Sequence, residues 1–132
     1  GTMAVKYFEI PNERSRVRRL DLDSKGRVWF VNSTLGKIGR LDPSTGAIKQ
    51  WDSPSGSSSH PYALAIIDDV IWYNESGMRP DALVRFNPES ESFQSWAIPS
   101  GVGIVRNVWK TEAGNLLIHQ SSSNQIGLVK IN

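Results

Sequence analysis

Two side chains that could carry acid–base chemistry lie 15 positions apart, His60 and Glu75. Removing a proton next to a carbonyl needs a base whose pKa lies near the working pH, and histidine is the usual one. A second group must stabilise the negative charge that develops. We therefore take His60 and Glu75 as candidate catalytic residues. The alternative is that His60 is a solvated loop residue, because it follows the polar run Ser-Gly-Ser-Ser-Ser at residues 55–59.

A second set of side chains suits the binding of anions. Arg18 and Arg106 occupy corresponding positions of a repeat described below, and Arg19 adjoins the first of them. Guanidinium groups match carboxylates and phosphates, so we expect a positive ring that binds a small molecule or a cyclic peptide. The alternative is that these arginines pair with acids such as Glu75 or Asp21. The other candidate ligand-binding residues are Asn32, Tyr62, Trp109 and Gln120.

The overall composition excludes several classes of function. The 132 residues include 15 basic and 13 acidic side chains, a net charge of +2, which gives no reason to expect nucleic acid or a membrane as a partner. There is no cysteine, so disulfide and thiolate chemistry are absent. No signal-peptide pattern is visible, which favours a soluble, cytoplasmic protein. Residues 1–4 resemble an expression remnant, and we expect them to be disordered.

The elements that must position these residues are repeated along the chain. Val28-Trp29-Phe30 recurs as Ile71-Trp72-Tyr73, 43 residues later, and more weakly as Leu116-Leu117-Ile118. The dipeptides that contain Pro11, Pro54 and Pro99 recur with spacings of 43 and 45 residues. A period of this length is typical of four-stranded propeller blades.

Short β-branched or aromatic segments fill each period. Arg27–Val31, Lys37–Leu41 and Ala47–Trp51 are predicted strands, separated by turns such as Asp-Pro-Ser-Thr-Gly at residues 42–46. Proline, aspartate and glycine each favour a tight turn there. No stretch has the 3.6-residue apolar period of a helix. The sequence therefore predicts an all-β chain.

Counted from the propeller axis outwards, the chain contains three sets of inner strands and three outer strands. The predicted blades are residues 12–53, 54–98 and 99–132, and an outer strand at residues 5–10 completes the last of them. Three blades cannot close a ring, because propellers usually have four to eight. The chain is therefore either half of a six-bladed homodimer joined by strand exchange or a piece of a longer propeller. The positions of the first and last strands favour the homodimer.

The repeated motifs resemble those of one known family. Gly-Arg-Val-Trp-Phe from Gly26, Gly-Lys-Ile-Gly-Arg-Leu-Asp-Pro from Gly36 and Ala-Leu-Val-Arg-Phe-Asn-Pro from Ala82 are similar to segments of the virginiamycin B lyases, or streptogramin lyases. The similarity covers roughly residues 7 to 131 and is closest to the C-terminal blades of that family. It implies a seven-bladed propeller in the complete family member. It also implies Mg²⁺-dependent opening of a cyclic depsipeptide antibiotic by elimination, with a histidine base and a metal-holding glutamate.

The family pattern maps only partly onto this chain. The positions of the histidine base hold Arg18, Tyr62 and Arg106, and His60 lies two residues before the second of them. The positions of the glutamate hold Asn32, Glu75 and Gln120, so Glu75 is the one candidate Mg²⁺ ligand of this kind. The resemblance thus implies a ligand-binding propeller with a C–O lyase site. The alternative is a non-catalytic interaction or scaffold module with the same fold.

Overall fold

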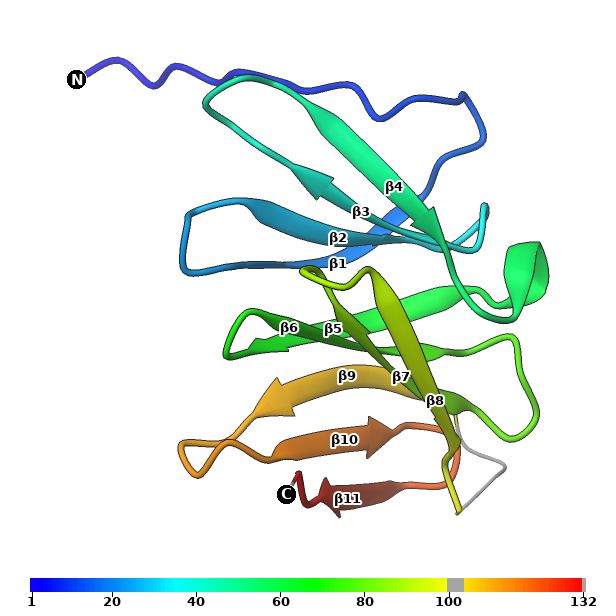
Figure 1. The fold of residues 1–132 in the computed structure, drawn as a ribbon. Coiled ribbons are helices and arrows are strands. Elements are labelled where there is room, and N and C mark those ends of the chain that lie inside the picture. Colours follow the sequence, from blue (N-terminus) through cyan, green and yellow to red (C-terminus); the bar gives the residue numbers. More distant parts are fainter. Residues whose placement is uncertain (100–103, 132) are drawn as a thin grey trace.

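The computed structural model describes residues 1–99 and 104–131 and contains, within that part, three antiparallel sheets (Figure 1). The first sheet consists of β1 (Val17–Leu22), β2 (Val28–Asn32), β3 (Lys37–Leu41) and β4 (Ile48–Asp52). The second consists of β5 (Pro61–Ile67), β6 (Val70–Glu75), β7 (Ala82–Asn87) and β8 (Ser92–Ala97). The third consists of β9 (Val105–Lys110), β10 (Leu116–Gln120) and β11 (Gln125–Val129). A 3-10 turn, η1 (Gly56–Ser58), precedes β5.

Local sequence explains the turns between the strands. After β3, Asp42 accepts hydrogen bonds through Oδ1 from the backbone N–H of Ser44, at 2.9 Å, and from its hydroxyl, at 2.6 Å. Gly46 then adopts a φ of 79°, in the left-handed region that glycine tolerates. The predicted all-β class is confirmed, and the strands predicted at residues 27–31, 37–41 and 47–51 are confirmed as β2, β3 and β4.

Two hydrophobic cores hold the sheets together, one in each gap between neighbours. The first contains Trp29 and Phe86, both fully buried, and Trp51 stacks on Trp29 at 5.4 Å between ring centroids. In the second, Trp72 stacks on Trp96 at 5.9 Å. The middle sheet contributes side chains to both cores, because successive residues on its strands point to opposite faces and a neighbouring sheet packs on each face. The repeated tryptophans therefore act as packing elements between sheets.

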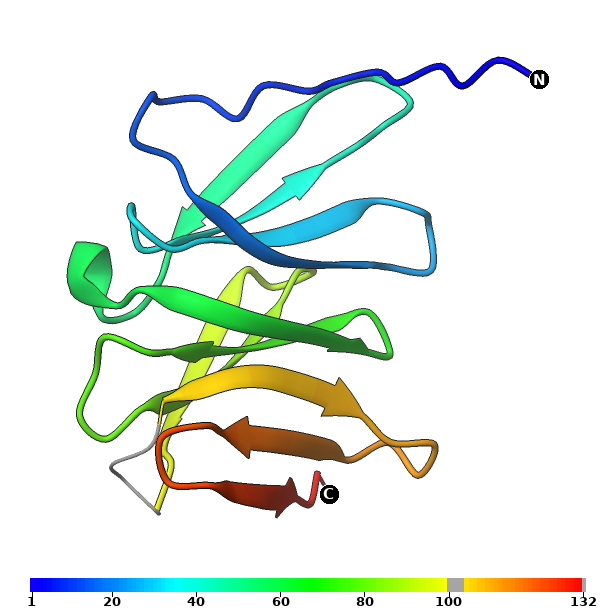
Figure 2. The same cartoon turned by 180° about the vertical axis from the view of Figure 1, so that it is seen from behind.

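The first strands of the three sheets, β1, β5 and β9, lie side by side along one edge of the stack (Figure 2). Each carries one extra residue relative to its partner strand, so that Val17, Pro61 and Val105 lie opposite Asn32, Glu75 and Gln120, respectively. The extra residues are β-bulges at the same point of every sheet. They define three equivalent positions, Arg18, Tyr62 and Arg106.

The structure differs from the sequence-based prediction at residues 5–10. The predicted outer strand there is not formed, and the third sheet has three strands instead of four. The reason is that a strand needs a pairing partner: the N-terminal segment lies beside the first sheet, at the opposite end of the stack from β11 (Figure 1). The predicted third blade, residues 99–132, includes residues 100–103 and 132, which lie outside the described part.

No helix in the described ranges is long and apolar enough to cross a membrane.

Candidate functional site

Three arginines surround one tyrosine on the edge formed by the first strands. The guanidinium carbons of Arg18, Arg19 and Arg106 lie 5.6, 5.8 and 5.4 Å from the centroid of the Tyr62 ring. Arg106 Nη1 also donates a long hydrogen bond of 3.4 Å to the Tyr62 hydroxyl. The arginines are exposed and Tyr62 is half-buried. We call Arg18, Arg19, Tyr62 and Arg106 the arginine–tyrosine cluster.

The β-bulges explain why these side chains meet. Consecutive residues on a regular strand point to opposite faces, yet Arg18 and Arg19 both reach the same ring. A bulge re-aims the side chains at the extra residue and increases the local twist. Arg19 was noted in the sequence only as a neighbour of Arg18. Its role depends on the bulge, which no local sequence signal predicts.

The cluster concentrates positive charge, and no acid in the described part of the chain forms an ion pair with it. Within residues 1–99 and 104–131, none of the salt bridges includes Arg18, Arg19 or Arg106. Asp21, a possible partner in the sequence, instead accepts hydrogen bonds from the backbone N–H groups of Leu22 and Ile66. The face of Tyr62 attracts guanidinium groups by about 0.5–1 kcal/mol each at exposed sites. The ring therefore holds the cations close together without cancelling their charge.

Glu75 lies inside the protein, away from this edge. Its side chain is fully buried, and both carboxylate oxygens accept hydrogen bonds: Oε1 from the Ser53 hydroxyl (2.5 Å) and the Ser55 N–H (3.0 Å), and Oε2 from the Ser55 hydroxyl (2.5 Å). The Ser53 hydroxyl is also 2.7 Å from the Tyr73 hydroxyl. Because Ser53 has a single hydroxyl proton and gives it to Glu75, Tyr73 is the donor in that pair. Burial raises the pKa of Tyr73 and keeps the phenol protonated.

Asn32 and Gln120, at the positions equivalent to Glu75, are buried as well, with exposed fractions of 0 and 2%. Asn32 Oδ1 accepts a hydrogen bond from the backbone N–H of Arg16, and its amide donates to Gln50 Oε1. These predicted ligand-binding residues therefore face the interior. The arrangement does not bring them into the arginine–tyrosine cluster.

His60 and Trp109 lie at separate places on the surface. His60 is exposed, has a φ of 45°, and its carbonyl accepts hydrogen bonds from the N–H and hydroxyl of Ser76. It is not among the hydrogen-bond partners of Glu75. Trp109 is 67% exposed on the outer face of the third sheet, opposite Leu117 on β10.

One buried carboxylate was not noticed in the sequence. Asp81 is 1% exposed, and its Oδ2 accepts hydrogen bonds from the backbone N–H of Val105 and from the amide of Asn74. Burial raises the pKa of Asp81, and these hydrogen bonds oppose the shift. The side chain joins the second sheet to the start of β9, so its role is to position that strand and the Arg106 that follows.

Comparison with solved structures identifies the architecture. Virginiamycin B lyase from Staphylococcus aureus, as a catalytically inactive variant with quinupristin, matches 92% of this chain with a TM-score of 0.82 at 24% identity. A streptogramin B lyase matches 94% with a TM-score of 0.77 at 17% identity. These matches decide the fold. The chain is a β-propeller segment.

The propeller segment spans 40–43% of the length of those two lyases, so their complete rings extend beyond it. No family model matches the sequence, and no curated protein matches it. The same fold occurs in an assigned 6-phosphogluconolactonase of Bacteroides uniformis, with a TM-score of 0.70 at 20% identity. The fold is thus shared by proteins of different function.

A magnesium ion does not fit the propeller residues predicted to hold it. Mg²⁺ requires oxygen ligands in near-octahedral geometry, and the two oxygens of Glu75 already accept three hydrogen bonds. The described residues contain no group of three or more histidines, cysteines or carboxylates that could hold a metal.

Proposed function

We propose that this propeller segment binds a small anionic ligand, a carboxylate or a phosphate, at the arginine–tyrosine cluster. The observation that carries the proposal is the convergence on one aromatic ring of three arginines that form no ion pair with any acid among residues 1–99 and 104–131. Guanidinium groups form paired, charge-assisted hydrogen bonds with planar oxyanions. The three arginines are exposed, so salt should weaken the binding, because exposed charges are screened over about 10 Å at 0.1 M ionic strength.

The ring of Tyr62 would orient the ligand as well as the arginines. Arg106 donates to the Tyr62 hydroxyl, which leaves the phenolic hydrogen free to donate to a bound oxyanion. Arg18 and Arg19 approach the ring from β1, and Arg106 approaches from β9. An anion at the cluster would therefore bridge all three sheets.

The test is a titration with inorganic phosphate and with citrate, followed by NMR of the backbone amide and arginine side-chain N–H groups. We expect saturable shifts at Arg18, Arg19, Tyr62 and Arg106. The double variant Arg18→Gln with Arg106→Gln should bind at least tenfold more weakly, because a hydrogen bond to a charged group contributes about 1.5–3 kcal/mol.

The double variant Lys25→Gln with Lys110→Gln is the control for the same change in net charge, since both side chains are exposed and lie at the ends of β1 and β9 opposite to Arg18 and Arg106. The proposal is refuted if this control weakens binding as much as Arg18→Gln with Arg106→Gln does, or if no anion saturates the shifts. The second result would favour a non-catalytic interaction module.

Lyase activity is a second candidate, favoured by the match to the lyase that was solved with quinupristin. It predicts loss of quinupristin with His60 as base, and loss of that activity in His60→Ala. The lyase activity of Glu75→Gln must be compared with that of the unsubstituted protein at the same folded fraction, because a substitution of the buried Glu75 also affects stability. Activity that survives His60→Ala, or no turnover with folded protein, would reject this candidate and leave the anion-binding proposal standing.

A further inference from the structure

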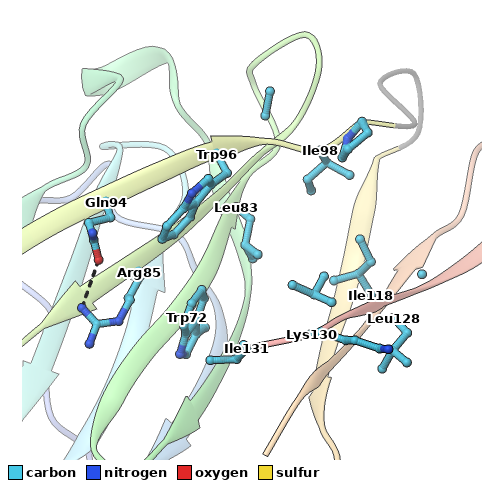
Figure 3. A pocket seen from close by; sticks show the side chains of 14 residues that line it. Trp72, Leu83, Arg85, Gln94, Trp96, Ile98, Ile118, Leu128, Lys130 and Ile131 are labelled. Carbon is cyan, nitrogen blue, oxygen red and sulfur yellow. Dashed lines mark hydrogen bonds between the residues drawn. The ribbon is translucent and has the colours of Figure 1, made fainter.

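A polar pair is buried between the second and third sheets. Asn74 of β6 and Asp81, which precedes β7, are 0 and 1% exposed. Their neighbourhood is apolar: Leu83 and Ile98, which line the groove between these sheets (Figure 3), are each 5% exposed and belong with Val105 to the second hydrophobic core. Burying an amide and a carboxyl group among apolar side chains costs free energy unless hydrogen bonds compensate. The pair therefore calls for a specific role.

The equivalent positions of the first sheet hold no polar side chain. Val31 is the last but one residue of β2, as Asn74 is of β6, and it is fully buried in the first core. Gly36 immediately precedes β3, as Asp81 precedes β7. The packing of two neighbouring sheets thus requires no polar group at either position. The role of the pair must lie in what its hydrogen bonds hold.

The pair holds both backbone polar groups of the residue before Arg106. Asp81 Oδ2 accepts a hydrogen bond from the Val105 N–H at 2.9 Å, and Asn74 Nδ2 donates one to the Val105 carbonyl at 3.0 Å. Asn74 Nδ2 also donates to Asp81 Oδ2 at 3.3 Å, so the two side chains orient each other. Arg106 is the extra residue of the β9 bulge. The pair therefore fixes the backbone from which the Arg106 side chain extends.

The same amide also holds the strand that carries Tyr62. Asn74 Oδ1 accepts a hydrogen bond from the Ala63 N–H at 2.8 Å, and Ala63 follows Tyr62 in the bulge of β5. An amide side chain accepts and donates at once, which a carboxylate cannot do. One side chain thus links two bulges. Across this link the guanidinium carbon of Arg106 lies 5.4 Å from the centroid of the Tyr62 ring.

We propose that Asn74 and Asp81 are positioning residues that hold Arg106 against Tyr62. The inference rests on the anion-binding function proposed above, and it names residues that set the affinity of that site without touching the anion. Arg106 is exposed, and ordering a long, free side chain opposes binding unless the side chain is already held in place. Arg18 starts from β1, which shares no hydrogen bond with the pair in the described part of the chain, so it serves as an internal reference.

The first test uses the ligand-free protein and measures the ring current of Tyr62 by NMR. A guanidinium group over the ring has its Hδ and Nε–H signals shifted upfield, and Tyr62→Leu gives the unshifted reference. Asp81→Ala should reduce the upfield shift of Arg106 by at least about half, because a side chain that samples several rotamers spends only part of its time over the ring. The shift of Arg18 should not change. Asp81→Asn keeps an acceptor oxygen and should retain both shifts.

Two further measurements separate positioning from a general loss of stability. Asn74→Ala should reduce the shift of Arg106 as Asp81→Ala does, whereas Val84→Ala should not, because Val84 is buried in the first core on the other face of the same sheet. In the unsubstituted protein, a scalar coupling across the hydrogen bond should join the Val105 nitrogen to the Asp81 carboxyl carbon. An Arg106 shift that survives Asp81→Ala, an equal loss in Val84→Ala, or absence of that coupling while those of the β5–β6 ladder are observed would overturn the proposal.

The second test measures the affinity for citrate in a double-mutant cycle. Asp81→Ala should weaken binding to the folded protein about fivefold, a typical effect within one hydrogen-bonded network. It should have no further effect in Arg106→Gln, because a positioning residue acts only through the side chain that it holds. Additive losses would overturn the proposal. A folded protein with the expected ring-current shifts that binds no citrate would refute the anion site and leave the positioning of Arg106 standing.

Discussion

Replacing Glu75 by alanine should destabilise the fold rather than act only on a ligand site. The substitution removes a fully buried carboxylate and leaves the Ser53 hydroxyl, the Ser55 hydroxyl and the Ser55 N–H without their acceptor. Ser53 and Ser55 follow β4 in the first sheet, and Glu75 ends β6 in the second. The carboxylate therefore ties two sheets together, and its loss should be felt by the whole chain.

The magnitude follows from two opposing effects. Hydrogen bonds to a charged group contribute about 1.5–3 kcal/mol each, whereas removing a buried charge relieves several kcal/mol of desolvation. The balance for three such bonds is a loss of about 3 kcal/mol in the free energy of unfolding. At about 4 °C per kcal/mol for a chain of this size, the melting temperature should fall by about 12 °C.

The assay is urea unfolding followed by tryptophan fluorescence, with Glu112→Ala as control because Glu112 is exposed. Glu75→Gln should cost less than Glu75→Ala, since the amide keeps the shape and one acceptor oxygen. If Glu75→Ala were within about 1 kcal/mol of Glu112→Ala, the buried network would contribute little stability. Glu75 would then have to be explained by a ligand or a metal, and the structural argument would fail.

Three further results are expected. Asp23→Asn and Asp81→Asn should change the pH dependence of the urea midpoint in opposite directions around the ordinary aspartate pKa of 3.8. Burial alone would raise the pKa of Asp23, but hydrogen bonds from Trp29, Arg27 and Lys25 lower that pKa overall. The ionised Asp23 therefore stabilises the fold, and this stabilisation is lost as the pH falls through the lowered pKa. Asp23→Asn should remove this acid-dependent loss of stability. Burial raises the pKa of Asp81, so the fold loses stability as the pH rises through the raised value, and Asp81→Asn should remove that decline. Trp29→Ala should cost about 3–5 kcal/mol in urea unfolding, because the ring is fully buried between two sheets. Gly77→Ala should lower the melting temperature more than Gly39→Ala, because its Cβ would lie 2.0 Å from the backbone oxygen of Ser58, whereas the obstacle at Gly39 is a side-chain ring.

The repeat made the fold predictable from the sequence. Trp29 and Trp72 mark the same strand in successive periods, and Asp42 and Gly46 specify the turn that follows the third strand. These signals are local or periodic, so they can be recognised in the sequence without knowledge of the tertiary contacts. The prediction of a strand at residues 5–10 was wrong for the single chain, because a strand is defined by its partner and the chain places β11 at the far end.

The candidate site was less predictable than the fold. Counting from the tryptophans aligned Glu75 with a metal-binding position, but two serines from the segment that follows β4 surround its carboxylate. Those serines lie 20 and 22 residues before Glu75 in the sequence, and nothing local indicates that their hydroxyls contact its carboxylate. Gln50, which receives the Asn32 amide, is likewise supplied from another strand.

The amino-acid sequence by itself determined the number of sheets, their strands and the residues that repeat, since strand and turn preferences act over a few neighbours. Only the tertiary structure decided which polar side chains face the interior and which reach the surface. The bulges on β1 and β5 turn Arg18, Arg19 and Tyr62 toward one another, whereas regular strands would have sent adjacent side chains to opposite faces. A one-residue shift in pairing is invisible in the sequence, yet it changes the face on which every charge lies.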